Sequence, residues 1–258
     1  MNETDPPGIT IFAGRFGSGK TETAINYALT LIQGSRFDAG ESATWLVQPG
    51  RDGQPGPGGV ILIDLDLVTP YFRSREMADV VRRRGVEVIA PAAIGQHLDT
   101  PAITPEILGA IQQRDRLVVL DVGGDRQGAR ALGQFSSAIR QRGYTMHFVV
   151  NPYRPFTATE EGLASSIAEI EASARLQVTS LVSNPNLMGE TTAQQILEGH
   201  AQIEAFAQAL GLPIAFVCLE QEWAAAFAPC VADPDSPGQG PLAQPVLPLE
   251  RHFVMSWE

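Results

Sequence analysis

Short apolar runs alternate along most of the chain with longer segments whose apolar residues recur at a spacing near 3.6. The short runs are rich in β-branched residues and predict strands at 9–13, 60–64, 86–90, 117–121, 146–150, 179–183 and 214–219. The longer segments predict helices at 20–33, 72–84, 105–113, 128–142, 159–174 and 192–210. This alternation is typical of βαβ units, so we expect a three-layer α/β fold with a mostly parallel central sheet flanked by helices.

Two stretches interrupt this pattern. Residues 34–59 are rich in Gly, Pro and charge around a short apolar island at 45–47, which indicates a surface insertion or hairpin. Residues 229–248 are rich in Pro and Gly with little periodicity, which indicates a tail that is disordered or ordered only by contact. We therefore expect one domain over 1–228 and a C-terminal tail over 229–258.

Several predicted strands run into a polar side chain, namely Asp64, Asp121, Asn151 and Asn184. In open α/β sheets, ligands bind outside the carboxyl ends of the strands, so these side chains are expected to converge on one site. Asn151 precedes a proline and is typical of a turn. Asn184 follows a late strand on the expected edge of the sheet, where its amide can contact a purine base.

A phosphate-binding loop follows the first predicted strand. Residues 14–21 match the complete G-x-x-x-x-G-K-[ST] pattern and lead into a helix. The glycines allow backbone N–H groups to surround phosphates, Lys20 neutralises the β and γ oxygens, and the Thr21 hydroxyl ligates Mg²⁺. The nucleotide contacts are expected from Gly14, Arg15, Phe16, Gly17, Ser18, Gly19, Lys20, Thr21 and Glu22.

Lys20 is also the single lysine of a chain that has seventeen arginines. A compact ammonium fits this position in the loop, whereas a planar guanidinium does not. Compositional drift accounts for the absence of lysine elsewhere, but it does not account for the lysine that is present. This contrast strengthens the prediction of a triphosphate site.

Acidic residues follow two other apolar strands. Asp121 has the position of the acid that holds Mg²⁺ through water in P-loop enzymes. The glycine-rich run that follows, 122–128, is either a switch that senses the γ-phosphate, with Asp125 as a catalytic candidate, or an ordinary turn. Asp64 is expected to support the metal and Asp66 to position the attacking water, and both have the alternative of capping the next helix.

These four landmarks, the P-loop, the Asp64–Asp66 element, the Asp121–Asp125 run and Asn184, occur in this order over 9–219. Together they resemble the SIMIBI-class P-loop NTPases, specifically the CobQ/CobB/MinD/ParA nucleotide-binding family, with nitrogenase iron protein and the arsenical-pump ATPase as relatives. The resemblance implies an ATP-dependent homodimer with Mg²⁺, in which the nucleotide is sandwiched and hydrolysis resets an interaction with a partner.

One departure from that family concerns Arg15. The family usually has a signature lysine at this position, which reaches across the dimer to the phosphates of the other subunit. An arginine can also stabilise a transferring phosphoryl group, with a different geometry. We therefore name Arg15 as a catalytic candidate beside Lys20 and Asp66, with Arg73, Arg75 and Arg154 in reserve.

Composition favours some partners over others. The formal charge of −11 and a single basic run at 82–84 argue against nucleic acid. The chain has no long apolar span and no signal-peptide pattern at its start, so we expect a cytoplasmic protein without a membrane anchor. Cys218 and Cys230 are the two cysteines, and neither is near the predicted switch loops, so no iron–sulfur cluster is expected.

The leading hypothesis is an ATP-hydrolysing switch that assists the maturation or activation of another enzyme. The alternative is a synthetase or amidotransferase-like enzyme that activates a small carboxylate, for which residues 71–75, His97 and Asp99 could form the substrate pocket. A module that binds nucleotide without hydrolysis is a third possibility. A nucleotide kinase is disfavoured because no arginine-rich lid follows the core helices.

Overall fold

The computed structural model describes residues 8–32, 35–36, 48–49, 58–66, 75–90, 105–227 and 242–252. The strands are β1 (Ile9–Ala13), β2 (Ser35–Arg36), β3 (Gln48–Pro49), β4 (Val60–Leu65), β5 (Glu87–Ile89), β6 (Leu117–Val122), β7 (Thr145–Val150), β8 (Ser180–Ser183), β9 (Ile214–Glu220) and β10 (Val246–Leu249). The α-helices are α1 (Lys20–Ile32), α2 (Arg75–Arg83), α3 (Pro105–Gln112), α4 (Arg126–Gly133), α5 (Ser136–Arg142), α6 (Glu160–Ala174), α7 (Ala193–Leu210) and α8 (Gln221–Phe227). Two short 3₁₀ helices, η2 (Pro155–Thr157) and η3 (Met188–Glu190), lie in loops.

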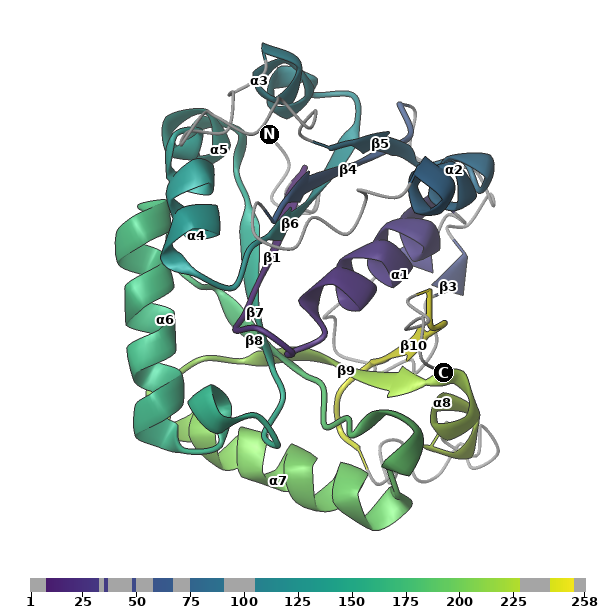
Figure 1. Cartoon of the computed structure of the whole chain (residues 1–258), viewed down its shortest axis with the longest axis vertical. Helices are drawn as coiled ribbons and strands as arrows, with labels where there is room; N and C mark the ends of the chain where they lie inside the picture. The colour runs from purple at the N-terminus through teal and green to yellow at the C-terminus, as the bar shows by residue number, and fades with distance from the viewer. Residues whose placement is uncertain are drawn as a thin grey trace.

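The main sheet has eight strands in the order β10-β9-β8-β7-β1-β6-β4-β5, and each neighbouring pair is parallel. The central strand β1 lies between β6 and β7, so the loop after β1 is flanked by the ends of the two adjacent strands (Figure 1). The expected α/β fold with a parallel sheet is confirmed. This order places the predicted acids of β4 and β6 on one side of the loop and the asparagines that follow β7 and β8 on the other side.

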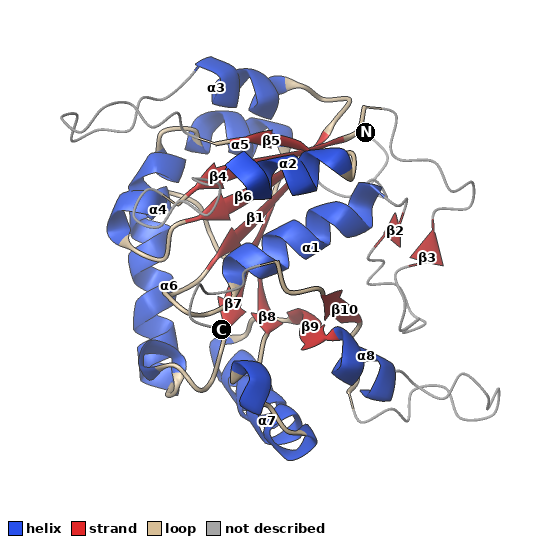
Figure 2. Ribbon diagram, turned by 45° about the vertical axis from the view of Figure 1, so that its right-hand side comes forward, coloured by secondary structure: helices blue, strands red, loops and turns tan. Residues whose placement is uncertain are grey.

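Helices cover both faces of the sheet, because successive side chains of each strand point to opposite sides. On β1, Ile9, Ile11 and Ala13 join the core under α3–α7, whereas Phe12 joins the core under α1 and α2. The two helical layers lie on either side of the sheet in Figures 1 and 2. Burial on both faces explains why the strands were visible as continuous apolar runs.

The helix expected over 128–142 is two helices, α4 and α5, and this prediction was wrong. A Cβ atom on Gly133 would lie 2.6 Å from the backbone oxygen of Ser173, so α4 ends where it packs closely on α6. Phe135 then turns into the core before α5 begins at Ser136. The periodic pattern continued across this turn, and therefore it did not show the break.

Two elements near the C-terminus were not predicted from the pattern. The helix α8 follows β9 directly, and β10, within the predicted tail, pairs in parallel with β9. The strand β8 lies between β7 and β9 and is an inner strand, so the expectation that Asn184 follows an edge strand was wrong. Within the predicted insertion, β2 and β3 pair antiparallel.

No helix in the described part of the chain is both long enough and apolar enough to cross a membrane.

Candidate nucleotide-binding site

The loop between β1 and α1 has the backbone of a phosphate-binding loop. Gly17 and Gly19 have φ angles of 76° and 86°, a region that residues with a Cβ atom rarely adopt. The N–H of Ser18 donates to the carbonyl of Arg15 at 3.0 Å, and α1 begins at Lys20. The loop therefore leads into the N-terminus of α1, the end of a helix whose N–H groups can bind an anion.

Asn184 supports this loop from the end of β8. Its side chain is buried, and its amide nitrogen donates to the carbonyl of Ser18 at 2.7 Å. A Cβ atom on Gly19 would overlap that same amide nitrogen. The amide nitrogen is therefore directed at the loop backbone, and the contact of Asn184 with a purine base stays a prediction.

Lys20 and the acids of β4 form a buried charged cluster. The ammonium of Lys20 lies 3.3 Å from a carboxylate oxygen of Asp66, and both side chains are nearly buried. The backbone N–H of Asp66 donates to Asp64 at 2.8 Å, and Asp64 has no exposed surface. The alternative that these acids cap the next helix concerns residues 67–74, which lie outside the described part of the chain.

Asp121 lies beside this cluster, opposite Asp64 in the register of β6 and β4. Neither of its buried carboxylate oxygens has a hydrogen-bond partner among the described residues, although the Thr21 hydroxyl is close enough to influence its pKa. Burial raises the pKa of Asp121 to about 6, and the charge of Lys20 opposes this rise. A buried carboxylate without partners next to a second acid and a hydroxyl fits a hydrated divalent cation.

The loop after β6 contacts the P-loop through glycine. A Cβ atom on Gly124 would lie 2.8 Å from both the carbonyl of Gly14 and the N–H nitrogen of Phe16. Asp125 is the N-cap of α4 and accepts a hydrogen bond from the N–H of Gly128 at 2.9 Å. In this structure Asp125 therefore fixes the start of α4, and its carboxylate has the role of a cap.

Arg15 points away from its own loop and toward α6. Its guanidinium lies 2.5 Å from the carboxylate of Glu169, donates to the Ser166 hydroxyl at 2.9 Å, and sits 5.3 Å from the ring centre of Phe156. Of the reserve candidates, Arg154 donates to the carbonyl of Gly17 at 3.1 Å. Arg73 and the side chain of Arg75 lie outside the described residues.

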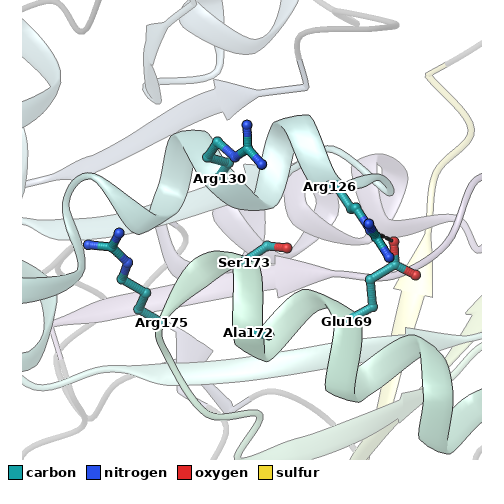
Figure 3. A pocket seen from close by; sticks show the side chains of 6 residues that line it. All are labelled: Arg126, Arg130, Glu169, Ala172, Ser173 and Arg175. Carbon is teal, nitrogen blue, oxygen red and sulfur yellow. Dashed lines mark hydrogen bonds and ion pairs between the residues drawn. The ribbon is translucent and has the colours of Figure 1, made fainter.

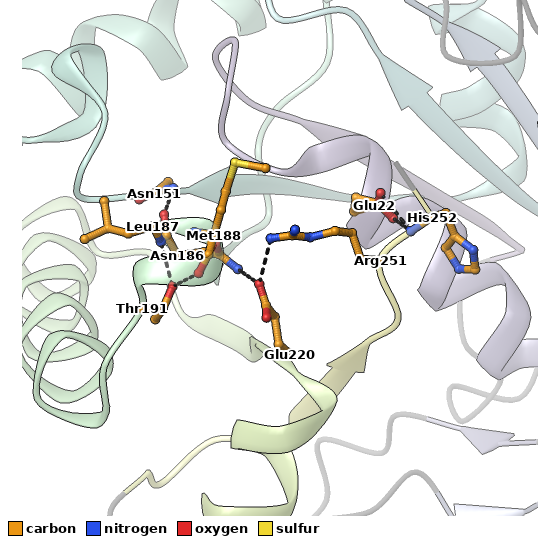
Figure 4. Close-up of polar contacts among 9 residues, drawn as sticks. All are labelled: Glu22, Asn151, Asn186, Leu187, Met188, Thr191, Glu220, Arg251 and His252. Carbon is orange, nitrogen blue, oxygen red and sulfur yellow. Dashed lines mark hydrogen bonds and ion pairs between the residues drawn. The ribbon is translucent and has the colours of Figure 1, made fainter. Parts of the chain in front are cut away.

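A polar network lies at the carboxyl ends of β8, β9 and β10 (Figure 4). The amide of Asn186 and the guanidinium of Arg251 each lie 3.4 Å from the same oxygen of Glu220. Asn151 accepts from the N–H of Tyr153, which confirms it as a turn former, and its amide donates to the carbonyl of Asn186 at 2.8 Å. On the opposite side, Glu22 accepts from the N–H of His252 at 3.1 Å.

The structure thus brings together most of the residues predicted from the sequence. Those that gather around the P-loop are Gly14, Ser18, Lys20, Thr21, Asp64, Asp66, Asp121 and Asn184. Phe16 is 73% exposed at the rim of the loop, and Glu22 contacts the C-terminal segment. His97 and Asp99, together with 71–74 of the alternative substrate pocket, lie outside the described residues, as does Cys230.

The sequence reasoning missed several residues, among them Glu220, Glu169 and Arg126. Glu220 ends β9 as Asp121 nearly ends β6, so the rule applied to the other strands could have found it. Glu169 and Arg126 are ordinary helical charges in the sequence. Their pairing at 2.7 Å, across 43 positions, could be recognised only in the folded chain.

The parallel sheet, the P-loop after its central strand and the acid at the end of the adjacent strand define an α/β fold of the P-loop NTPase type. No protein-family model and no curated protein matches the sequence.

Three similar solved structures are proteins called FtsY. Cell division protein FtsY of Thermotoga maritima has 18% identity, a TM-score of 0.50, and an alignment that covers 84% of this chain and 63% of that chain. Chloroplast FtsY of Physcomitrella patens has 18% identity, a TM-score of 0.48 and coverages of 83% and 58%. Signal recognition particle receptor FtsY of Elizabethkingia anophelis has 16% identity, a TM-score of 0.46 and coverages of 83% and 59%.

This chain therefore spans less than two thirds of the length of those proteins. At such identity the likeness concerns the fold, and it does not single out the CobQ/CobB/MinD/ParA branch.

Proposed function

We propose that the protein binds a nucleoside triphosphate with Mg²⁺, hydrolyses it, and uses the nucleotide state to control an interaction with a partner. The observation that carries this proposal is the convergence of Lys20, Asp66 and Asp121 at the P-loop. Within the proposal the nucleotide is ATP, as the family resemblance implies. The partner is an enzyme whose maturation or activation the protein assists, and the active form is a homodimer.

The residues present fit a magnesium ion. Thr21 supplies the hydroxyl, Asp121 supplies buried oxygens that lack hydrogen-bond partners among the described residues, and Asp64 supports them from the adjacent strand. When bound, the ion neutralises charge on the β and γ phosphates. The positive charge of the ion would also stabilise the buried carboxylate of Asp121 and so offset the electrostatic cost of its burial.

The other side chains have distinct tasks in the proposal. The ammonium of Lys20 turns from Asp66 to the phosphates, because a phosphate oxygen in the loop is a stronger partner for a buried ammonium. Asp66, released from that ion pair, orients the attacking water. Asn184 holds the carbonyl of Ser18 and thereby keeps the loop open for the phosphates.

We place the nucleobase at the network of Asn186, Glu220 and Arg251. These residues lie at the carboxyl ends of β8, β9 and β10, where ligands of parallel sheets bind. The carboxylate of Glu220 can accept from an exocyclic amino group, and the guanidinium of Arg251 can donate to a ring nitrogen or carbonyl. A comparison of ATP and GTP in the wild type and in Glu220→Gln measures this contribution.

The test of nucleotide binding is calorimetric titration of ATP and GTP with Mg²⁺, followed by phosphate release. Lys20→Ala removes the ammonium and is expected to weaken triphosphate binding by at least about 100-fold, because a charge-assisted contact in a buried site is worth roughly 3 kcal/mol. Arg114→Ala, an exposed arginine in the loop after α3, is the control for a loss of positive charge. Asp66→Ala is expected to abolish phosphate release while binding persists.

Two results would contradict the proposal. Wild-type protein that bound neither triphosphate in the presence of Mg²⁺ would remove its basis. Equal binding by Lys20→Ala and Arg114→Ala would show that the P-loop is not the site.

A further inference from the structure

A hollow on the outer side of the molecule lies between α4 and α6, next to the loop that follows Asp121. Its volume is about 420 Å³, and it is open to solvent. Six residues line it: Arg126, Arg130, Glu169, Ala172, Ser173 and Arg175 (Figure 3). None of them belongs to the P-loop or to the acidic cluster, so the hollow is distinct from the nucleotide site.

The lining of the hollow has more arginines than acidic residues and therefore a net positive charge. Glu169 is its one acid, and that carboxylate is shared between Arg126 at 2.7 Å and Arg15 at 2.5 Å. Arg130 and Arg175 have no ion-pair partner in the part of the chain that the structure describes, and both are exposed. In a chain of formal charge −11, such a concentration of guanidinium groups attracts an anionic partner.

The arrangement favours several carboxylates over one compact anion. In Figure 3 the guanidinium groups of Arg130, in α4, and Arg175, directly after α6, lie apart and do not converge on one point. A hollow that is open to solvent also differs from the enclosed pockets that hold small molecules. Nucleic acid would need a longer basic track than these few arginines provide.

We propose that the α4–α6 hollow docks an acidic segment of a partner protein, through Arg130 and Arg175 with Arg126 at the edge. Planar guanidinium groups pair with carboxylates through two parallel hydrogen bonds, which makes Asp and Glu side chains suitable occupants. The docking itself does not require nucleotide.

Docking is coupled to the nucleotide site through Glu169, and this part rests on the proposed function. The carboxylate joins Arg15 of the P-loop to Arg126, the first residue of α4. An arriving carboxylate competes with Glu169 for Arg126, whose side chain is 74% exposed and thus accessible. Glu169 then pairs with Arg15 alone. Partner binding thus changes the strength of the ion pair that holds Arg15, the second residue of the P-loop.

The experiment measures fluorescence anisotropy of a fluorescein-labelled oligoglutamate peptide in low-salt buffer, with an uncharged oligoglutamine peptide as the reference. The variant Arg130→Glu/Arg175→Glu is expected to bind about tenfold more weakly than the wild type, since two exposed pairs each contribute roughly a factor of three. Arg83→Glu/Arg114→Glu makes the same change in net charge on exposed residues elsewhere and is expected to stay within about twofold. Thermal melts verify that both variants are folded.

Equal peptide binding by the two variants would overturn the docking site. Tighter binding of a thymidine oligonucleotide with the same dependence on Arg130 and Arg175 would overturn the acidic partner in favour of nucleic acid. Inorganic phosphate that bound these arginines as well as the peptide did would reassign the hollow to a small oxyanion.

The coupling has its own measurement. By linkage, Mg-ATP is expected to change the peptide affinity of the wild type by at least about twofold, and Glu169→Gln to remove that change. An unchanged affinity would overturn the coupling. Peptide binding without any nucleotide binding would contradict the proposed function and leave the docking site in place. Nucleotide binding without peptide binding would overturn the docking site and leave the proposed function in place.

Discussion

Burial of Asp121 lowers the stability of the nucleotide-free fold at neutral pH. Its pKa is raised to about 6, mainly by burial, while Lys20 and Thr21 lower it and Asp66 raises it. A carboxyl group whose pKa is higher in the folded state than in the unfolded state stabilises the fold below its unfolded value, near 3.8, and that stability is lost as the pH rises through 6. At neutral pH, the nucleotide-free protein therefore carries an unfavourable buried charge.

We expect Asp121→Asn to stabilise the nucleotide-free protein at pH 7.5 by about 1 to 3 kcal/mol, because the amide removes that charge. The advantage is expected to shrink as the pH falls below 6 and to vanish near 4. Thermal unfolding followed by circular dichroism across this range measures it. A variant less stable than the wild type at pH 7.5 would show that the charge is already compensated.

The same substitution is expected to remove the stabilisation by Mg-ATP. Ligand that binds only the folded state raises the melting temperature, and the wild type is expected to show this rise. Asp121→Asn is expected to show little of it, since the amide lacks the negative charge and one of the two oxygens that would hold the hydrated cation. A full rise in the variant would place the metal elsewhere.

At the scale of elements, the loop after β6 lies so close to the P-loop that there is no room for a side chain at Gly124. Gly124 lies against the backbone of Gly14 and Phe16, and backbone atoms cannot move aside as a flexible side chain can. We expect Gly124→Ala to force the loop after β6 away from the P-loop and to lower nucleotide turnover at least about tenfold, a cost near 1.4 kcal/mol. Phosphate release measures the effect.

Gly109 offers a matched control for that substitution. It lies within α3, and a Cβ atom added there meets no atom within 4 Å. Gly109→Ala is expected to keep wild-type turnover and to raise stability by about 0.5 to 1 kcal/mol, as alanine favours a helix. Equal turnover of the two variants would contradict a functional contact between the loops.

The strand β10 gives a second prediction at this scale. Leu247 is fully buried in the core that α1 and α2 cover, although the sequence pattern placed it in a tail. Leu247→Ala is expected to cost about 2 to 5 kcal/mol, because it leaves a cavity in a packed core. Leu197→Ala, at a side chain that is 40% exposed, is expected to cost far less in the same urea unfolding experiment. Similar losses would argue that β10 is not part of the cooperative fold.

What could be predicted from the sequence follows from the range of the forces involved. The strands carrying Asp64 and Asp121 and the P-loop with Lys20 are local patterns, and their meeting follows from the topology of parallel sheets. The short strand β10 has a proline at position 248 and forms only because β9 offers an open edge. The partner of Arg15 is 154 positions away, so no local rule connects them.

At the scale of the whole molecule, the position of Arg15 bears on the proposed homodimer. In this structure Glu169, Ser166 and Phe156 of the same chain hold its guanidinium. To reach the phosphates of a second chain, as the family resemblance implies, it must leave that position. Under the proposed homodimer, the short ion pair with Glu169 would oppose dimerisation, and weakening it would favour the dimer.

We accordingly expect Glu169→Gln to increase the dimer fraction in the presence of Mg²⁺ and a non-hydrolysable ATP analogue. The dissociation constant of the dimer, measured by light scattering, is expected to fall about threefold. Arg15→Ala is expected to decrease it, since the charge that would cross the interface is lost. Arg154→Ala removes a second arginine near the P-loop and distinguishes a specific effect of Arg15 from a loss of positive charge.

Because Glu169→Gln and Arg15→Ala both break the ion pair, a contribution of that pair to folding alone would move the two variants in the same direction. Opposite shifts are expected only if Arg15 itself acts across the interface, and a dimer unaffected by Arg15→Ala would restrict this residue to its own chain.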